Sequence, residues 1–375
     1  MTILVLQKEE GIAREGAAYL RAFCRRGDRV VTVHADFRPN GDLNELLARC
    51  PEQPALILHP EHIPIMPRGL TKVNIPTACF QIDTYTYTRK RIAWSMLFDL
   101  VFVFHPGYDT AFRTAGHPGA HFIPHAIEPS LFGGEELVRV FEVGWVGQTR
   151  GPVYRAREHL LPMLSRSFRM NDWSRRHESE EMVRIYRQSK IVVNIGRDDF
   201  PQDANLRAFE AMAAGALLLT PLPTELTQIG FEDGIHFVGF RKETEIIPLV
   251  RKYLLEESAR RGIADVARDK VLHEHSYDRR VETILKLAKQ NGRNILAPAR
   301  SWPEERVHLA YLDYFAGNGR LDCALEELRA IAGLSLGDAT RGAGMLAHAW
   351  ARRSRAWMTG AIRSVRRSRK GGATD

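Results

Sequence analysis

Two charged side chains, Arg207 and Glu210, are three residues apart in the segment Asn205 to Thr220 and should share one face of a helix. The helix is predicted to begin after Asn205, a good N-cap residue, and to end at Gly215. An arginine at a helix start attracts a diphosphate, and a carboxylate one turn later can accept hydrogen bonds from a ribose diol. The alternative is a solvated Glu210 paired with Arg207 on a surface helix. The predicted chemistry is nucleotide binding.

A second candidate site is the turn that follows the apolar run Phe141 to Val146. It contains a small residue, an amide, a hydroxyl and a guanidinium in sequence: Gly147, Gln148, Thr149 and Arg150. Backbone amides in such a turn can approach a phosphate closely. A plain connection between a strand and a helix would have a similar composition. Its place at the start of the second half of the chain favours the phosphate-binding interpretation.

The elements that would position these residues alternate between short apolar runs and helical patterns. Strands are expected near 3–6, 30–34, 55–59, 77–81, 100–104 and 121–124, and again near 141–146, 168, 191–195, 216–219 and 236–240. Helical patterns at 13–24, 42–49, 153–164, 179–188 and 246–255 separate them, and two more follow at 304–315 and 321–331. This alternation is typical of open parallel sheets, and the predicted fold class is α/β.

The segment Asn205 to Thr220 resembles the donor-site helix of GT-B glycosyltransferases, in particular the CgeB-like subgroup and the broad group 1 transferases. The segment Ile123 to Phe132 is similar to the interdomain linker of that family, and Ser179 to Ile195 to the helix and strand before its donor site. The resemblance covers residues 95–290 with motifs and residues 1–95 only in pattern. Many relatives carry a second Glu eight residues before the ribose-binding Glu, where this chain has Gln202 beside Asp203.

The resemblance implies two Rossmann-like domains that face a cleft, followed by a helical extension. We expect an acceptor domain at 1–128, a donor domain at 129–297, and an extension with a basic amphipathic tail at 298–375. It implies that Gly147, Gln148, Thr149, Arg150, Asn205, Leu206, Arg207 and Glu210 bind a nucleotide-diphosphate sugar. Arg207 would neutralise the departing diphosphate, and Glu210 would hold the ribose.

Asp83 is the leading candidate for a group that accepts a proton from the acceptor hydroxyl or orients it. It follows the run Thr77 to Gln81, at the edge of a parallel sheet where ligands bind. A turn or helix-cap role is the alternative for Asp83. His59 and His105 also follow strands, and structural roles are expected for both.

Composition excludes several other functions. The chain has no GxGxxG, Walker A, GxSxG or HExxH motif and no Asp-x-Asp metal anchor, so neither a metal nor a further cofactor is expected. Cys24, Cys50, Cys79 and Cys323 are scattered singly, as reduced thiols are. The net charge of +8 comes largely from eight basic residues between Arg352 and Lys370, so the main body is not expected to bind nucleic acid.

The tail also bears on localisation. No signal peptide or membrane span is evident, which predicts a cytoplasmic protein. Residues 349–365 place Trp350, Trp357, Met358, Ala361, Ile362 and Val365 on one helical stripe, with arginines elsewhere around it. Such a helix can hold a protein at the inner face of an anionic membrane, or it can dock on the body and end in a solvated tail.

The predicted activity is metal-independent hexosyl transfer from a nucleotide-diphosphate sugar to an acceptor hydroxyl, in bacterial glycan or glycoconjugate synthesis. The acceptor would be a glycan, a lipid-linked molecule or a protein. Two alternatives stay open: a sugar-nucleotide epimerase, and a non-catalytic GT-B-like scaffold that binds a nucleotide or a partner enzyme.

Overall fold

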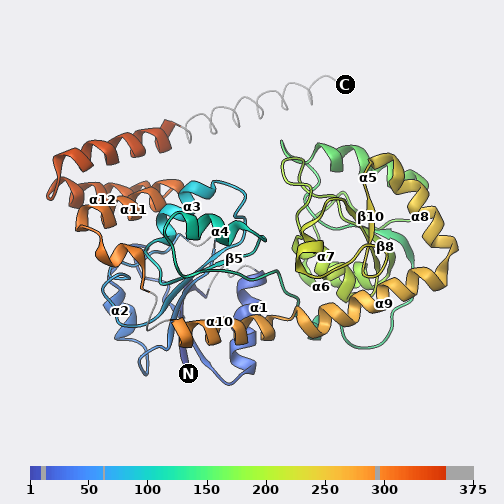
Figure 1. The fold of residues 1–375 in the computed structure, drawn as a ribbon, viewed down its shortest axis with the longest axis horizontal. Helices are drawn as coiled ribbons and strands as arrows, with labels where there is room; N and C mark the ends of the chain where they lie inside the picture. The colour runs from blue at the N-terminus through green and yellow to red at the C-terminus, as the bar shows by residue number, and fades with distance from the viewer. Residues whose placement is uncertain (10–13, 62–63, 292–295, 352–375) are drawn as a thin grey trace, which may run out of the picture.

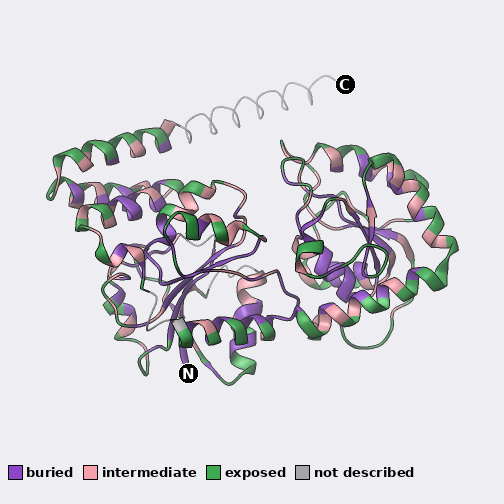
Figure 2. Cartoon of the chain, viewed as in Figure 1, coloured by how far each residue is buried: buried purple, intermediate pink, exposed green. Residues whose placement is uncertain are grey.

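A computed structural model of the 375-residue chain describes residues 1–9, 14–61, 64–291 and 296–351. Two parallel sheets organise these residues into two lobes, seen side by side in Figure 1. In each lobe the strands are buried and the helices expose their outer faces, as Figure 2 shows. The structure therefore confirms the α/β class with two tandem Rossmann-like domains.

The first sheet has six parallel strands in the order β2-β1-β3-β4-β5-β6. Their apolar, often β-branched residues suit strands that are covered on both faces. The strands are β1 (Thr2–Lys8), β2 (Arg29–Val33), β3 (Leu56–His59), β4 (Thr77–Gln81), β5 (Leu100–Val103) and β6 (Ala120–Phe122). The helices are α1 (Arg14–Arg25), α2 (Leu43–Leu47), α3 (Thr88–Ser95) and α4 (Tyr108–Thr114). The strand order reverses between β1 and β3, and such a switch point opens a crevice at the carboxyl edge of a sheet.

The second sheet has four parallel strands in the order β10-β9-β8-β7. These strands are β7 (Phe141–Gly144), β8 (Ser189–Val193), β9 (Leu217–Pro221) and β10 (Val238–Phe240). Around them lie α5 (Arg155–Ser167), α6 (Ser179–Arg187), α7 (Leu206–Ala213), α8 (Ile246–Leu255) and α9 (Glu257–Glu274). The expected strand near residue 168 is reduced to a single bridge between Val143 and Met170.

The end of the described chain returns to the first lobe. Helix α10 (Tyr277–Asn291) packs against α1, with Val281 and Ile284 in the same core as Phe23. Helices α11 (Glu304–Gly317) and α12 (Leu321–Ala332) then cover the other face of that sheet (Figure 1). The expected boundary at residue 297 thus leaves α10 with the donor domain in sequence, whereas its apolar side is buried on the first lobe.

A buried carboxylate joins the extension to the first sheet. Asp99, 1% exposed at the start of β5, accepts hydrogen bonds from the amides of Thr77 and Ala297, at 2.9 and 2.8 Å. Arg300 lies 3.2 Å from the same carboxylate. A buried charge needs such partners, so this network determines where the extension begins.

Two further expectations concern thiols and the tail. The cysteines are unpaired, as predicted; Cys79 and Cys323 are buried, but Cys24 is exposed. No helix among the described residues is long and apolar enough to cross a membrane. The basic amphipathic tail from residue 352 onward lies outside the described residues, and Trp350, the first residue of its apolar stripe, is 63% exposed.

Candidate functional site

The turn after β7 lines a cavity of about 570 Å³ in the second lobe. Its four predicted residues, Gly147, Gln148, Thr149 and Arg150, form one wall. The opposite wall is the loop Ser174 to His177, which adds Arg175 and Arg176. Three arginines around backbone amides are a composition that favours an anion such as a diphosphate, and Arg175 among them is also ion-paired with Glu181.

Two guanidinium groups hold this turn in place from below. Arg207 Nε donates to the Val146 carbonyl at 3.0 Å, and Arg157 Nη1 donates to the Gln148 carbonyl at 2.9 Å. Both lie over the buried ring of Trp145, at 4.9 and 5.6 Å from its centroid. Burial lowers the pKa of Arg157 to about 9, with the charge of Arg207 acting in the same direction.

Gly147 is required by this arrangement. A Cβ atom at Gly147 would lie 2.5 Å from Arg207 Nη2, closer than any real contact allows. The turn can therefore rest directly on Arg207 only because the residue has no side chain. Arg207 is thus placed beneath the phosphate-binding turn that the sequence predicts.

The start of α7 differs in one respect from the prediction. Asn205 occupies the N-cap position, but its side chain makes no cap hydrogen bond. Its Nδ2 atom instead donates to Asn194 Oδ1 at 3.1 Å, and Arg207 Nη1 donates to the same oxygen at 3.1 Å. The buried amide of Asn194 at the end of β8 therefore competes successfully for the asparagine, and it joins Asn205 and Arg207 in one network.

Glu210 and Arg207 are three residues apart on α7 but have different surroundings, since Arg207 contacts the turn after β7 and Glu210 faces the interdomain linker. It is 6% exposed and lines a small cavity with Ile127, Glu128 and Tyr277 at the interdomain linker. Leu206, the first residue of α7, is half-buried. Glu210 is therefore not the solvated surface carboxylate of the alternative interpretation, but nor does it line the cavity of the Gly147 turn.

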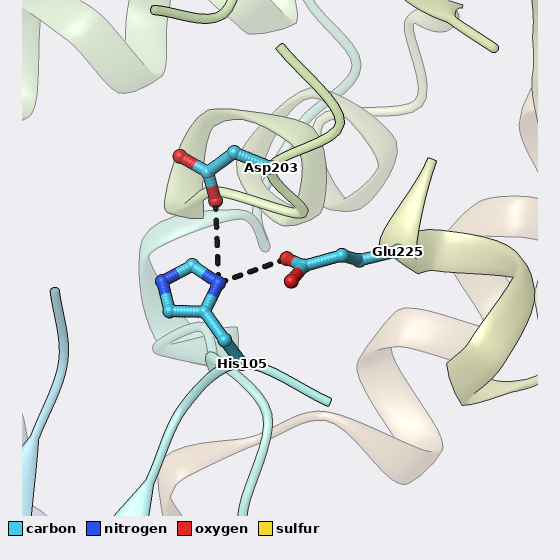
Figure 3. A group of neighbouring side chains, drawn as sticks. All are labelled: His105, Asp203 and Glu225. Carbon is cyan, nitrogen blue, oxygen red and sulfur yellow. Dashed lines mark hydrogen bonds and ion pairs between the residues drawn. The ribbon is translucent and has the colours of Figure 1, made fainter. Parts of the chain in front are cut away.

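A buried cluster joins the two lobes at the carboxyl ends of their strands (Figure 3). His105 follows β5 in the first lobe, whereas Asp203 comes from the loop before α7 and Glu225 begins a 3-10 helix, Glu225–Ile229, of the second. His105 Nδ1 lies 2.9 Å from Glu225 Oε2 and 3.9 Å from Asp203 Oδ1. Glu225 Oε2 also accepts a hydrogen bond from the Ala204 amide, at 3.1 Å.

Burial alters the acid–base behaviour of this cluster. Desolvation raises the pKa of Asp203 to about 6, although His105 and His125 act to lower it. Burial is the largest single effect on His125 and opposes its charging, but the hydrogen bond to Glu15, at 3.1 Å, and the charges of Glu15, Asp203 and Asp83 together raise the pKa of His125. The cluster therefore holds a carboxyl that changes protonation near neutral pH, as a general acid or base must.

Aromatic rings surround the cluster and include a residue close to Asp83. Tyr85 stacks on Phe200 of the second lobe with ring centroids 4.2 Å apart, and its edge faces His105 at 5.0 Å. Its hydroxyl donates to Asp83 Oδ1 at 3.4 Å. The structure thus brings Asp83 and His105 to the same interdomain region, as the strand-end rule predicted.

Several of these residues were not singled out by the sequence. Arg175 and Arg176 lie in a loop whose charged residues look like an ordinary solvated turn. Glu225 and Arg157 belong to no recognised motif, and their partners are far away in sequence. His125 in the linker and Asp203 beside Gln202 were visible signals, because each is a titratable residue within a segment that resembles the family.

His105, Asp203 and Glu225 also have the right donor atoms for a divalent cation, all within 4.8 Å of one another. The direct contact of His105 Nδ1 with Glu225, however, gives that nitrogen a proton-sharing partner. The group therefore fits two descriptions: a direct His105–Glu225 contact between the two lobes, or a cation site.

Comparisons with known proteins agree with the fold. Residues 148–286 match the family model described as glycosyl transferase-like. HepE from Anabaena, solved with UDP and glucose, is 12% identical over 77% of this chain and all of its own, with a TM-score of 0.54. A glycosyltransferase from Rickettsia africae gives 9% identity, 78% and 99% coverage, and a TM-score of 0.55. Sucrose-phosphate synthase from Thermosynechococcus elongatus is 12% identical over 77% of this chain and 98% of its own, with a TM-score of 0.52. No curated protein matches the sequence. The predicted GT-B fold and glycosyl transferase-like second domain are confirmed.

Proposed function

We propose, from a glycosyl transferase-like domain within a GT-B fold, that this protein transfers a hexose from a nucleotide-diphosphate sugar to an acceptor hydroxyl. The observation that carries the proposal is the cavity of about 570 Å³ in the second lobe, which the glycine turn with Arg150 lines together with Arg175 and Arg176. HepE, of the same fold, was solved with UDP-glucose. A uridine or related diphosphate is the ligand that this chemistry favours.

In the proposed reaction, Arg150 and Arg175 stabilise the negative charge that develops on the leaving diphosphate. Arg207 acts as a positioning residue, since it supports the turn through the Val146 carbonyl. Glu210 is proposed to accept hydrogen bonds from the ribose after the linker side of α7 opens. Asp83, beside Tyr85 at the interdomain contact, is proposed to orient the acceptor hydroxyl. Contact between the lobes would exclude water from the reacting atoms.

The test is calorimetric titration of the full chain with UDP, GDP, dTDP, ADP and CMP. We expect one nucleoside diphosphate to bind and Arg150→Ala to weaken its binding about tenfold or more, since a charge-assisted contact is lost. Arg166→Ala, on the exposed side of α5, is the matched control and should bind as the wild type does. Failure of every diphosphate to bind would refute the proposal.

The ribose contact can be separated from the phosphate contact. Glu210→Gln should weaken binding of the nucleoside diphosphate but not of pyrophosphate, which has no ribose. Equal weakening of both ligands would contradict the proposed ribose role. Binding of a diphosphate without turnover of any sugar nucleotide would favour the scaffold alternative, which Gln202 keeps open, and an altered sugar nucleotide without an acceptor would favour the epimerase.

Metal independence belongs to the proposal as well. His105 and Glu225 satisfy each other directly, so we expect transfer to continue in the presence of EDTA at the rate seen without it. Restoration by Mg²⁺ or Mn²⁺ of an activity lost to EDTA would show instead that the cluster of Figure 3 binds a cation.

A CgeB-like subtype, with Gln202 in place of a glutamate, and a peripheral membrane position remain parts of the proposal. The membrane contact would come from the basic amphipathic tail beyond residue 351. A chain that ends at Ala351 should bind the nucleotide normally but should no longer sediment with vesicles of phosphatidylglycerol. Unchanged sedimentation of the shortened chain would rule out the tail as the anchor.

A further inference from the structure

A second cavity, of about 220 Å³, lies in the first lobe between α3 and α11. His59 at the end of β3 forms its floor, and β3 is one of the two strands at the switch point of the sheet. Ligands of open α/β sheets bind at this edge. One wall, however, comes from the extension: Asp313 and Tyr314 lie in α11, and Asn318 directly follows it. The cavity therefore exists only because the extension folds back on the first lobe.

The lining combines aromatic rings with paired charges. Trp94 and Tyr87 supply aromatic surface, and Tyr87 is 73% exposed at the rim with a left-handed φ of 53°. A residue of this size rarely adopts that conformation, and such outliers cluster at ligand sites. Lys90 pairs with Asp313 at 3.3 Å, and Arg91 pairs with Glu61. Each cation in the lining thus has an acid beside it.

This balance indicates the chemistry of the ligand. An anionic ligand would need a surplus of cations, and a cationic one a surplus of acids, whereas the two pairs cancel. A neutral molecule with many hydroxyl groups can exchange hydrogen bonds with both members of each pair and pack its C–H surface on the aromatic rings. The volume is below the range of about 300 to 1,000 Å³ typical of drug-sized ligands, which suits a single sugar ring.

The cavity is also connected to the proposed reaction centre. Glu61 lines it and accepts a hydrogen bond from the Asp83 amide at 3.2 Å. Asp83 in turn contacts Tyr85, which stacks on Phe200 of the second lobe. A sugar held between α3 and α11 would therefore contact Glu61, which is hydrogen-bonded to the backbone of the residue proposed to orient the acceptor hydroxyl.

We infer that the cavity between α3 and α11 binds the terminal, uncharged sugar ring of the acceptor, and that α11 of the extension sets the acceptor specificity. This inference rests on the proposed function. It assigns to the extension a direct role in recognition, in addition to covering the first sheet.

The test uses the full chain and four probes, the methyl glycosides of glucose, galactose, mannose and N-acetylglucosamine. Binding of each probe is measured by saturation-transfer NMR titration. At least one probe should bind, and Asp313→Asn should weaken it about tenfold, because the partly buried carboxylate that pairs with Lys90 is replaced by a neutral amide. Glu304→Gln is the matched control, since Glu304 also comes from α11 and pairs with a lysine, Lys72, at 3.2 Å, outside the cavity. The control should bind the probe unchanged.

Each other outcome overturns the inference. These are binding of none of the four glycosides, equal binding by Asp313→Asn, and an equal loss in Glu304→Gln. If Asp313→Asn does not fold, Asn318→Ala at the exposed end of the wall replaces it, with the same expectation. Nucleotide titration of the same samples separates the two proposals: diphosphate binding without glycoside binding refutes the acceptor cavity alone, whereas loss of diphosphate binding refutes the proposed function.

Discussion

At the scale of residues, buried charge is concentrated where the lobes meet. Asp203 and Glu225 are 8% and 4% exposed, and His105 is 2% exposed. Removing such groups from water is costly unless they are paired, and Asp203 Oδ1 has no hydrogen-bond partner among the described residues. The buried Asp203 carboxyl thus lowers the stability of the fold, at a position where it could exchange a proton in the proposed reaction.

Asp203 should therefore make the protein less stable as the pH rises. A carboxyl with a pKa near 6 in the folded state and 3.8 when unfolded favours folding while protonated, and this advantage is lost between pH 4 and pH 6. At pH 8, Asp203→Asn should raise the free energy of unfolding by roughly 1 to 3 kcal/mol and the melting temperature with it. At pH 4.5 both should change less. Thermal denaturation at both pH values checks this.

The matched control is Asp199→Asn. Asp199 is exposed, and its hydrogen bond to Arg197 lowers its pKa. This variant should show no gain at pH 8. Equal melting temperatures of Asp203→Asn and the wild type at both pH values would contradict the assigned effect of burial on Asp203.

At the scale of elements, α11 contributes to both the core and the cavity of the first lobe. Leu312 and Phe315 are fully buried in the core of the first lobe, whereas Asp313 and Asn318 line the cavity. The residues of one helix that face the sheet and those that face the cavity are thus a single residue apart. Stability and proposed acceptor recognition can be altered separately on this helix.

Phe315→Ala should destabilise the first lobe by about 3 to 5 kcal/mol, because a buried aromatic ring leaves a void that packing fills only in part. Leu325→Ala on α12, where the side chain is 42% exposed, should change stability by less than about 0.5 kcal/mol. Chemical denaturation followed by tryptophan fluorescence measures both. Equal effects would show that the extension is not packed as described.

At the scale of the whole molecule, the two lobes share an aromatic and ionic contact. Phe200 stacks on Tyr85, and its edge faces His105 at 5.2 Å. Arg197 lies over the Tyr85 ring at 5.3 Å. These contacts hold the carboxyl edges of the two sheets together, which is the arrangement that would exclude water in the proposed transfer.

Phe200→Ala should loosen this contact. We expect a larger radius of gyration in solution scattering and more hydrolysis of the sugar nucleotide relative to transfer, since water reaches the donor. Phe168→Ala removes a phenylalanine of similar burial from the core of the second lobe and should leave the radius of gyration unchanged. An unchanged radius in Phe200→Ala would mean that other contacts keep the lobes together.

The sequence by itself determined the local elements and the general chemistry. Strand β4 begins and ends at the predicted residues, and the other predicted strands and helices lie within a few residues of their expected positions, except the strand expected near residue 168. Helices α3 and α4 were not predicted. The periodicity of apolar residues is a local property, so it can be read without knowing the fold. The Gly147 turn, Asp83 and His105 were found because residues after parallel strands share one edge of a sheet.

Only the tertiary structure decided which distant residues meet. Asn205 bonds to Asn194 instead of capping its own helix, Glu225 reaches His105 across the two lobes, and α11 completes a cavity on the first. These contacts join positions far apart in the chain, and each forms because burial leaves a polar group with a single available partner or an apolar helix face with a single sheet to cover. Spacing along one sequence contains no record of that competition.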